Sequence, residues 1–82
     1  MAYDPACCSD QDCAPIPLHA VTVEADGWHV HLEPGDHPLV FRTIDARIPF
    51  DSTRLRKSTD GQFHACIFVG RVFCFYAPPK GF

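Results

Sequence analysis

The stretch Phe63-His64-Ala65-Cys66-Ile67-Phe68-Val69-Gly70-Arg71-Val72-Phe73-Cys74-Phe75-Tyr76 decides the fold of this chain. It is the most hydrophobic part of the sequence, and Gly70-Arg71 interrupts it near its middle. Two such runs of β-branched and aromatic residues around a glycine turn are typical of a β-hairpin. Because both faces of these strands are apolar, we expect the hairpin at the centre of a sheet.

A second hairpin is predicted in the first half of the chain, where residues 21–24 and 28–32 alternate around Asp26-Gly27. A two-residue type I′ loop there places Glu24 opposite His29 and Thr22 opposite His31. The core face of this hairpin would carry Val21, Val23, Trp28, Val30 and Leu32, and the polar face Thr22, Glu24, His29 and His31.

The remaining elements are shorter. Residues 39–48 read as one interrupted strand that Pro49 ends, and residues 51–57 as a turn of helix capped by Asp51. Ser9-x-x-Asp12 fits a capping pattern, which predicts a helical turn around the N-terminal cysteines. The expected fold is mostly β, a five-stranded antiparallel sheet or open barrel made of two hairpins and a middle strand, with a short N-terminal helical turn.

A chain of 82 residues allows one domain, and 46% hydrophobic residues are enough for a packed core. We divide the chain into a cysteine-bearing N-terminal segment 1–17, a β body 18–76 and a Pro-rich tail 77–82. A domain of this size is marginally stable without an added crosslink.

Five cysteines supply that crosslink: Cys7, Cys8 and Cys13 near one end, and Cys66 and Cys74 near the other. Small disulfide-rich domains belong to oxidising compartments, so we expect a periplasmic or secreted protein. No apolar stretch reaches transmembrane length, and Met1-Ala2-Tyr3-Asp4 does not begin a signal peptide. We therefore interpret Met1 as an initiator residue placed before a mature exported chain; a cytosolic metal-binding protein is the alternative.

Strand register decides how the cysteines pair. With a two-residue Gly70-Arg71 turn, Cys66 and Cys74 point to opposite faces and cannot bond to each other, whereas a three-residue loop over 69–71 would place them directly opposite. We prefer the two-residue turn, so each is expected to bond to one of Cys7, Cys8 and Cys13. A bridge from Cys8 to Cys66 is worth about 4 kcal/mol, against about 2 kcal/mol for a local Cys8–Cys13 loop. The fifth cysteine is expected to remain outside these two bonds, either as a harmless thiol or as the link of a disulfide-bonded dimer.

Three sequence blocks carry a resemblance. They are Cys7-Cys8-Ser9-x-x-Asp12-Cys13, Ser58-x-Asp60-Gly61-x-Phe63-His64-x-Cys66 and Gly70-Arg71-Val72-x-Cys74-Phe75-Tyr76-x-Pro78-Pro79. Together they resemble a group of small uncharacterised exported bacterial proteins, over most of the chain. The resemblance implies export and brings no activity with it.

Charge is unevenly distributed. Residues 1–41 contain seven acidic residues and no Lys or Arg, while all seven basic residues lie in residues 42–82. Partial neutralisation between the packed halves is our preferred interpretation. The alternative is a basic patch for an unknown protein or a small anionic ligand, formed by Arg42, Arg47, Arg54, Arg56 and Lys57. A sequence pI of about 5.9 and the lack of a recognised module argue against nucleic-acid binding.

Two histidine motifs are candidate metal ligands. His29-x-His31 places two imidazoles on one strand face near Glu24, a set that suits zinc, although an exposed polar face explains the same pattern. His64-x-Cys66 suits copper if Cys66 is a free thiol, and is a half-buried strand segment if Cys66 is bonded. His19 or His37 would be the third imidazole near His29 and His31.

No nucleophile, metalloprotease or phosphate-loop motif is present. We therefore expect no catalytic residues and no cofactor. The sequence favours a non-enzymatic exported binding module, with a periplasmic copper- or zinc-binding protein as the alternative.

Overall fold

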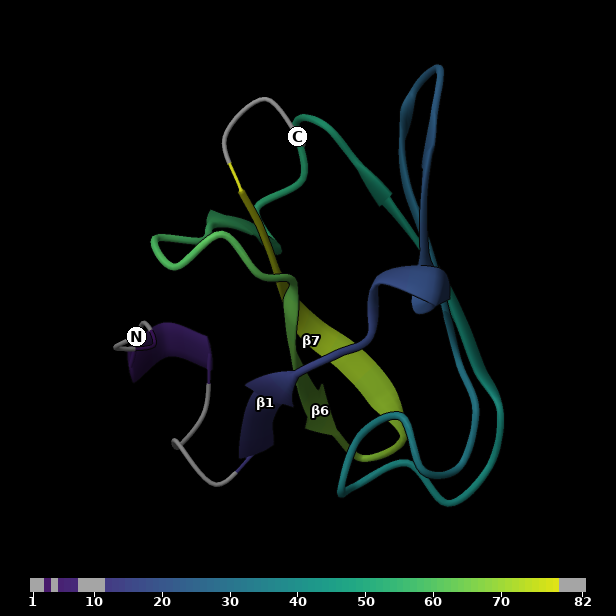
Figure 1. Cartoon of the computed structure of the whole chain (residues 1–82). Helices are drawn as coiled ribbons and strands as arrows, with labels where there is room; N and C mark the ends of the chain where they lie inside the picture. The colour runs from purple at the N-terminus through teal and green to yellow at the C-terminus, as the bar shows by residue number, and fades with distance from the viewer. Residues whose placement is uncertain (1–2, 4, 8–11, 79–82) are drawn as a thin grey trace.

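Seven strands form two sheets in the described part of the chain, residues 3, 5–7 and 12–78 of a computed structural model (Figure 1). One sheet has the order β1-β6-β7-β5 and the other the order β2-β3-β4. The strands are β1 (Cys13–Pro15), β2 (Val21–Glu24), β3 (Gly27–Leu32), β4 (Ile44–Pro49), β5 (Leu55–Lys57), β6 (His64–Phe68) and β7 (Arg71–Ala77), and the 3-10 turns are η1 (Pro5–Cys7) and η3 (Leu18–Ala20).

The mostly β class is confirmed, but the prediction of five antiparallel strands is wrong. β1 and β5, of three residues each, were not predicted, and β5 pairs with β7 in parallel. The segment expected as a helical turn over 51–57 instead makes two tight turns, in which Ser52 N–H donates to the Pro49 carbonyl and Leu55 N–H to the Ser52 carbonyl. The chain thereby crosses from one sheet to the edge of the other.

Two further boundaries differ from expectation. The strand expected over 39–48 begins only at Ile44, because His37 organises the residues before it. The Val40 N–H donates to the His37 carbonyl, and the Leu39 N–H to His37 Nδ1. The predicted helical turn of 9–12 lies largely outside the described residues; Cys7 ends η1 and Cys13 begins β1, so these two do not share one turn.

The β6–β7 hairpin occupies the middle of its sheet, as its apolar faces predict, but in another register. Its loop is Val69-Gly70, both at positive φ, rather than Gly70-Arg71. An irregularity between Cys66 and Ile67 then brings Cys66 directly opposite Cys74. The expectation that these two cysteines face opposite sides is therefore wrong, because a bulge shifts the register by one residue.

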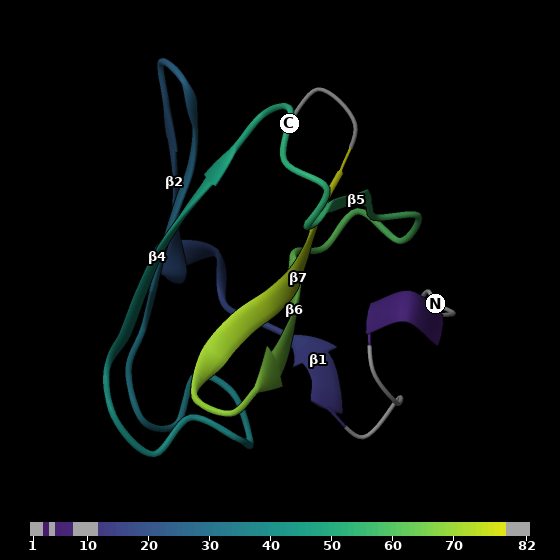
Figure 2. The same cartoon turned by 180° about the vertical axis from the view of Figure 1, so that it is seen from behind.

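The β2–β3 hairpin has its loop at Ala25-Asp26, so Thr22 faces His29 and Glu24 faces Gly27. The pairing of the two strands is shifted by two residues relative to the prediction, and a shift of two keeps each side chain on its predicted face. A Cβ at Gly27 would lie 2.3 Å from the Ile48 carbonyl oxygen, so only glycine fits here. Val23 was expected in the core but is 53% exposed, because the end of this hairpin projects beyond the other sheet (Figure 2).

The main core lies between the two sheets. Trp28 packs edge-on against Phe63, and Phe63 stacks on Phe75 with ring centroids 5.8 Å apart. Aliphatic side chains from both sheets surround these rings, among them Val30, Leu32, Ile48, Ile67 and Val72.

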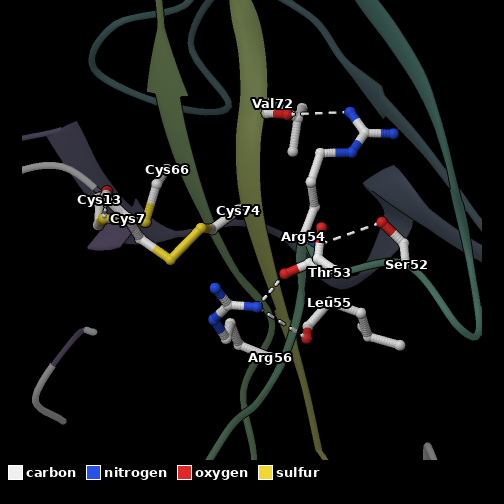
Figure 3. The surroundings of a disulfide bond; sticks show 10 residues. All are labelled: Cys7, Cys13, Ser52, Thr53, Arg54, Leu55, Arg56, Cys66, Val72 and Cys74. Carbon is white, nitrogen blue, oxygen red and sulfur yellow. Dashed lines mark hydrogen bonds between the residues drawn. A yellow bond between two sulfur atoms is a disulfide. The ribbon is translucent and has the colours of Figure 1, made fainter. Parts of the chain in front are cut away.

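A second, smaller cluster covers the opposite face of the β6–β7 hairpin (Figure 3). It contains two disulfides, Cys7–Cys74 and Cys13–Cys66, beside Tyr76. Each hairpin cysteine thus bonds to an N-terminal one. Cys8 takes part in neither bond and lies outside the described residues, so the free thiol and the disulfide-linked dimer stay predictions.

Candidate functional site

Three arginines line a cleft of about 290 Å³ where β4 passes β7. Arg47 comes from β4, Arg71 begins β7, and Arg54 lies on the connection before β5. The guanidinium of Arg54 crosses between the sheets, donating to the Val72 carbonyl at 3.2 Å and to the Arg47 carbonyl at 3.0 Å (Figure 3 shows the first bond). We call this the arginine cleft.

A larger cleft of about 550 Å³ continues from it, since both are lined by Ile44 and Gly70. We call it the apolar cleft, because its walls are mostly hydrophobic: Leu39, Phe41, Ile44, Ile67, Phe68 and Val69, with Asp12 and Arg42 among the polar residues. Phe41 is 79% exposed and Phe68 is 51% exposed. Large apolar side chains gathered at a concave surface are typical of a binding site rather than of an ordinary solvent-exposed loop.

Val69 is the most unusual residue of the apolar cleft. It sits at the tip of the β6–β7 turn with φ 51°, a left-handed conformation that β-branched residues strongly disfavour. Its side chain is 81% exposed, so core packing does not offset this strain. Asn or Gly would suit the turn better, which makes Val69 costly to the fold and available to a ligand.

The structure divides the predicted basic patch. Arg47 and Arg54 line the arginine cleft and Arg42 the apolar cleft. Arg56 and Lys57 lie on β5, where the Arg56 guanidinium donates to the carbonyls of Thr53 and Leu55. Arg71 was missed, because the sequence shows it only as a turn residue next to Gly70.

On the open face of β2-β3-β4, imidazoles and carboxylates alternate in what we call the histidine ladder: Glu24, His29, Asp45, His31 and Glu33. Asp45 is central, with one oxygen 2.8 Å from His29 Nε2 and the other 2.8 Å from His31 Nδ1. The second ring nitrogen of His31, Nε2, lies 2.8 Å from Glu33 Oε2. At the outer end of the ladder, Glu24 also forms an ion pair with Arg47.

These contacts shift two pKa values in opposite directions. Hydrogen bonds to Asp45 and then Glu33 raise the pKa of His31, because both carboxylates favour the imidazolium form. Hydrogen bonds from His31 and then His29 lower the pKa of Asp45. His31 can donate from both ring nitrogens only when protonated, so the ladder is a charge-paired surface network.

The sequence grouped Glu24, His29, His31 and His64 as metal candidates. The structure brings the first three together around Asp45 and places His64 in the other sheet. Within residues 3, 5–7 and 12–78, no group of three or more His, Cys, Asp or Glu side chains is arranged to hold a metal ion. The copper or zinc function therefore stays a prediction.

His64 belongs to a buried network beside the disulfides. Its Nε2 donates to Asp60 at 2.9 Å, and the Tyr3 hydroxyl donates to its Nδ1 at 2.9 Å. The bond from His64 is the main reason why the pKa of Asp60 lies well below its usual range. Cys66 is disulfide-bonded, so no His64–thiolate pair forms.

His37 is the other buried histidine and holds the 33–43 connection against the first sheet. Its Nε2 donates to the Ala65 carbonyl at 2.9 Å, which makes it a neutral structural residue. Burial lowers its pKa, because the imidazolium form would lose hydration. His19 lies elsewhere, 3.6 Å from Asp36, so the structure shows neither histidine joining His29 and His31.

Among the described residues, no helix has the length and apolar character needed to cross a bilayer. Comparison of the chain with protein-family models, with curated proteins and with solved structures found no match in any of the three. The two clefts and the histidine ladder are therefore interpreted from their own chemistry.

Proposed function

We propose that this protein is a non-enzymatic binding module of an oxidising compartment, and that its ligand occupies the apolar cleft. The observation that carries the proposal is the exposure of Phe41, Phe68 and Val69 around one concavity of about 550 Å³. Exposed apolar side chains that line a cleft contribute little to folding and much to association, because a ligand would remove their surface from water.

The strain at Val69 supports the same conclusion. A β-branched side chain at positive φ costs the fold roughly 1–2 kcal/mol, and this valine recovers little of it because it projects into solvent. Strained residues of this kind cluster at functional sites, where binding rather than stability explains them.

Two disulfides are compatible with a periplasmic or extracellular protein, which supports the proposed compartment. A metal-binding function has no comparable support from the described side chains. The binding module is therefore the function that we put forward.

The test separates binding from folding. A phage-displayed library of linear peptides is selected on the intact oxidised protein, and enriched peptides are mapped by amide chemical shifts. We expect shifts at residues 39, 41–44 and 67–70, which line the apolar cleft. Val69→Asn should raise the free energy of unfolding by about 1 kcal/mol while weakening peptide binding at least tenfold.

Val23→Asn is the matched control, since Val23 is also an exposed valine but lies on β2, outside the apolar cleft. It should leave peptide affinity unchanged. Peptides that map to another surface, or that bind Val69→Asn as tightly as the wild type, would contradict the proposal.

A further inference from the structure

We infer that the occupant is an extended polypeptide segment whose apolar residues fill the apolar cleft and whose acidic residues reach the arginine cleft, seated along the open edge of β4. This inference rests on the proposed function and adds the class of partner. It is carried by the continuity of the two clefts, the backbone of β4 and the charge of the arginines.

The clefts form one path. Both contain Ile44 on one wall and Gly70 on the other, so a ligand leaving the apolar cleft enters the arginine cleft directly. Along this path, the hydrophobic walls of the apolar cleft are followed by the positively charged walls of the arginine cleft. An amphipathic chain with its apolar and acidic residues in that order matches this change.

One wall of the path is the edge of a sheet. Among the described strands, β4 pairs with β3 alone, because the order of its sheet is β2-β3-β4. Alternate residues of an antiparallel edge strand direct their N–H and C=O groups away from the neighbouring strand. The Arg47 carbonyl does so, since it accepts from Arg54 at 3.0 Å. Asp45 lies two residues earlier, so its N–H and C=O also point away from β3, and it lines the arginine cleft.

An extended peptide satisfies such an edge by adding a strand, a recurring mode of recognition in which the backbone supplies affinity and alternate side chains supply specificity. A lipid acid would meet the same apolar and positive walls but would leave the edge of β4 without a partner strand. Arg54 blocks the far end of the path, between the Arg47 and Val72 carbonyls. The strand would therefore lie on the turn side of Arg54, beside Asp45.

The charge favours acidic side chains. Arg47, Arg54 and Arg71 line the arginine cleft, and Asp45 is its acidic member. The Arg47 guanidinium is ion-paired with Glu24, so the positive charge offered to a ligand comes from Arg54 and Arg71. Asp45 is already engaged by His29 and His31, at 2.8 Å each. Guanidinium groups recognise carboxylates through paired, charge-assisted hydrogen bonds, which selects Asp and Glu over neutral residues.

The experiment uses a peptide selected on the wild-type protein and mapped to the apolar cleft. Replacing its Asp and Glu by Asn and Gln should weaken binding at least tenfold, and raising the salt concentration should weaken the acidic form alone. Arg71→Gln should remove most of this preference. Lys57→Gln, which changes an exposed basic residue on β5 outside both clefts, should not alter it.

Backbone recognition is tested by N-methylation, which removes one peptide N–H at a time. Methylation at alternate peptide positions should abolish binding, whereas methylation at the intervening positions should not, and amide exchange at Asp45 and Arg47 should slow on binding. A peptide that binds in the apolar cleft without this alternation, or equally well in its neutral form, would overturn the inference while leaving the proposed function intact.

Decanoate provides the remaining arm. If decanoate changes the amide chemical shifts of the apolar cleft, and slows amide exchange there more than any selected peptide does, the occupant is a lipid acid and the inference is wrong. If nothing binds in the apolar cleft, the proposed function itself fails.

Discussion

At the scale of single residues, Arg54 is a side chain that bonds to both sheets. It donates to a carbonyl of β4 and to one of β7, and its own backbone carbonyl accepts from the Phe75 N–H at 2.9 Å. A guanidinium reaches two carbonyls at once because its donors diverge in one plane, whereas an ammonium is a single point of charge. Arg56, two residues later, donates to the carbonyls of Thr53 and Leu55 in its own segment.

Arg54→Lys should therefore lower the free energy of unfolding by about 1–2 kcal/mol, through loss of one charge-assisted hydrogen bond to a carbonyl. Arg56→Lys is the matched control and should cost less than about 0.5 kcal/mol. Urea denaturation followed by the fluorescence of Trp28 measures both. Equal losses in the two variants would show that Arg54 does not join the sheets.

At the scale of elements, the sequence could predict both hairpins, because their turn residues and alternation are local signals. It could not predict β1 and β5, since three-residue strands form only where a neighbouring strand offers hydrogen bonds. The register of β6 and β7 was missed because a bulge leaves no mark in an apolar run. The residues of the histidine ladder on β3 followed from alternation alone. Arg71 could not be assigned to a site without the placement of one sheet beside the other.

The histidine ladder gives a prediction about pH. His31, with its pKa raised above 6.5, stabilises the fold below pH 6.5, and this contribution is lost as pH rises through the raised pKa. Asp45, with its pKa lowered below 3.8, contributes above that pH and loses its contribution as pH falls through the lowered value. Asp45→Asn should move the pKa of His31 down towards 6.5, measured by NMR titration of the ring proton.

Asp51→Asn is the control for that titration, because Asp51 is exposed and lies on the connection after β4. It should leave the pKa of His31 where it is. An unchanged His31 pKa in Asp45→Asn would mean that the ladder does not persist in solution.

At the scale of the whole molecule, the disulfides supply stability that a core of this size cannot. Bonds that close 67 and 53 residues are each worth about 4 kcal/mol when formed alone, in the chain-entropy treatment. A domain of 82 residues is stable by roughly 4–12 kcal/mol in total. Two crosslinks therefore account for a large share of what keeps the chain folded.

Removing either bond as a Cys-to-Ser pair, Cys7 with Cys74 or Cys13 with Cys66, should lower the free energy of unfolding by about 3 kcal/mol, because the remaining bond leaves a loop of only about 14 residues for the other to close. The two losses should be nearly equal, since the entropy depends only on the logarithm of loop length. Cys8→Ser is the control and should cost little. Denaturation of the three variants measures this, and stability unchanged by both pairwise removals would refute the role assigned to the bonds.

The two disulfides are nested, because Cys13–Cys66 lies wholly within the span of Cys7–Cys74. If the oxidised chain is pulled from its two ends, the Cys7–Cys74 bond transmits the force. The residues between these two cysteines then bear almost none of it. Reduction would then release roughly 230 Å of additional contour length. A protease that cut once between residues 14 and 65 would leave two fragments still tethered at both bridges. The nested arrangement of the two disulfides thus protects the fold both against pulling forces and against a single proteolytic cut.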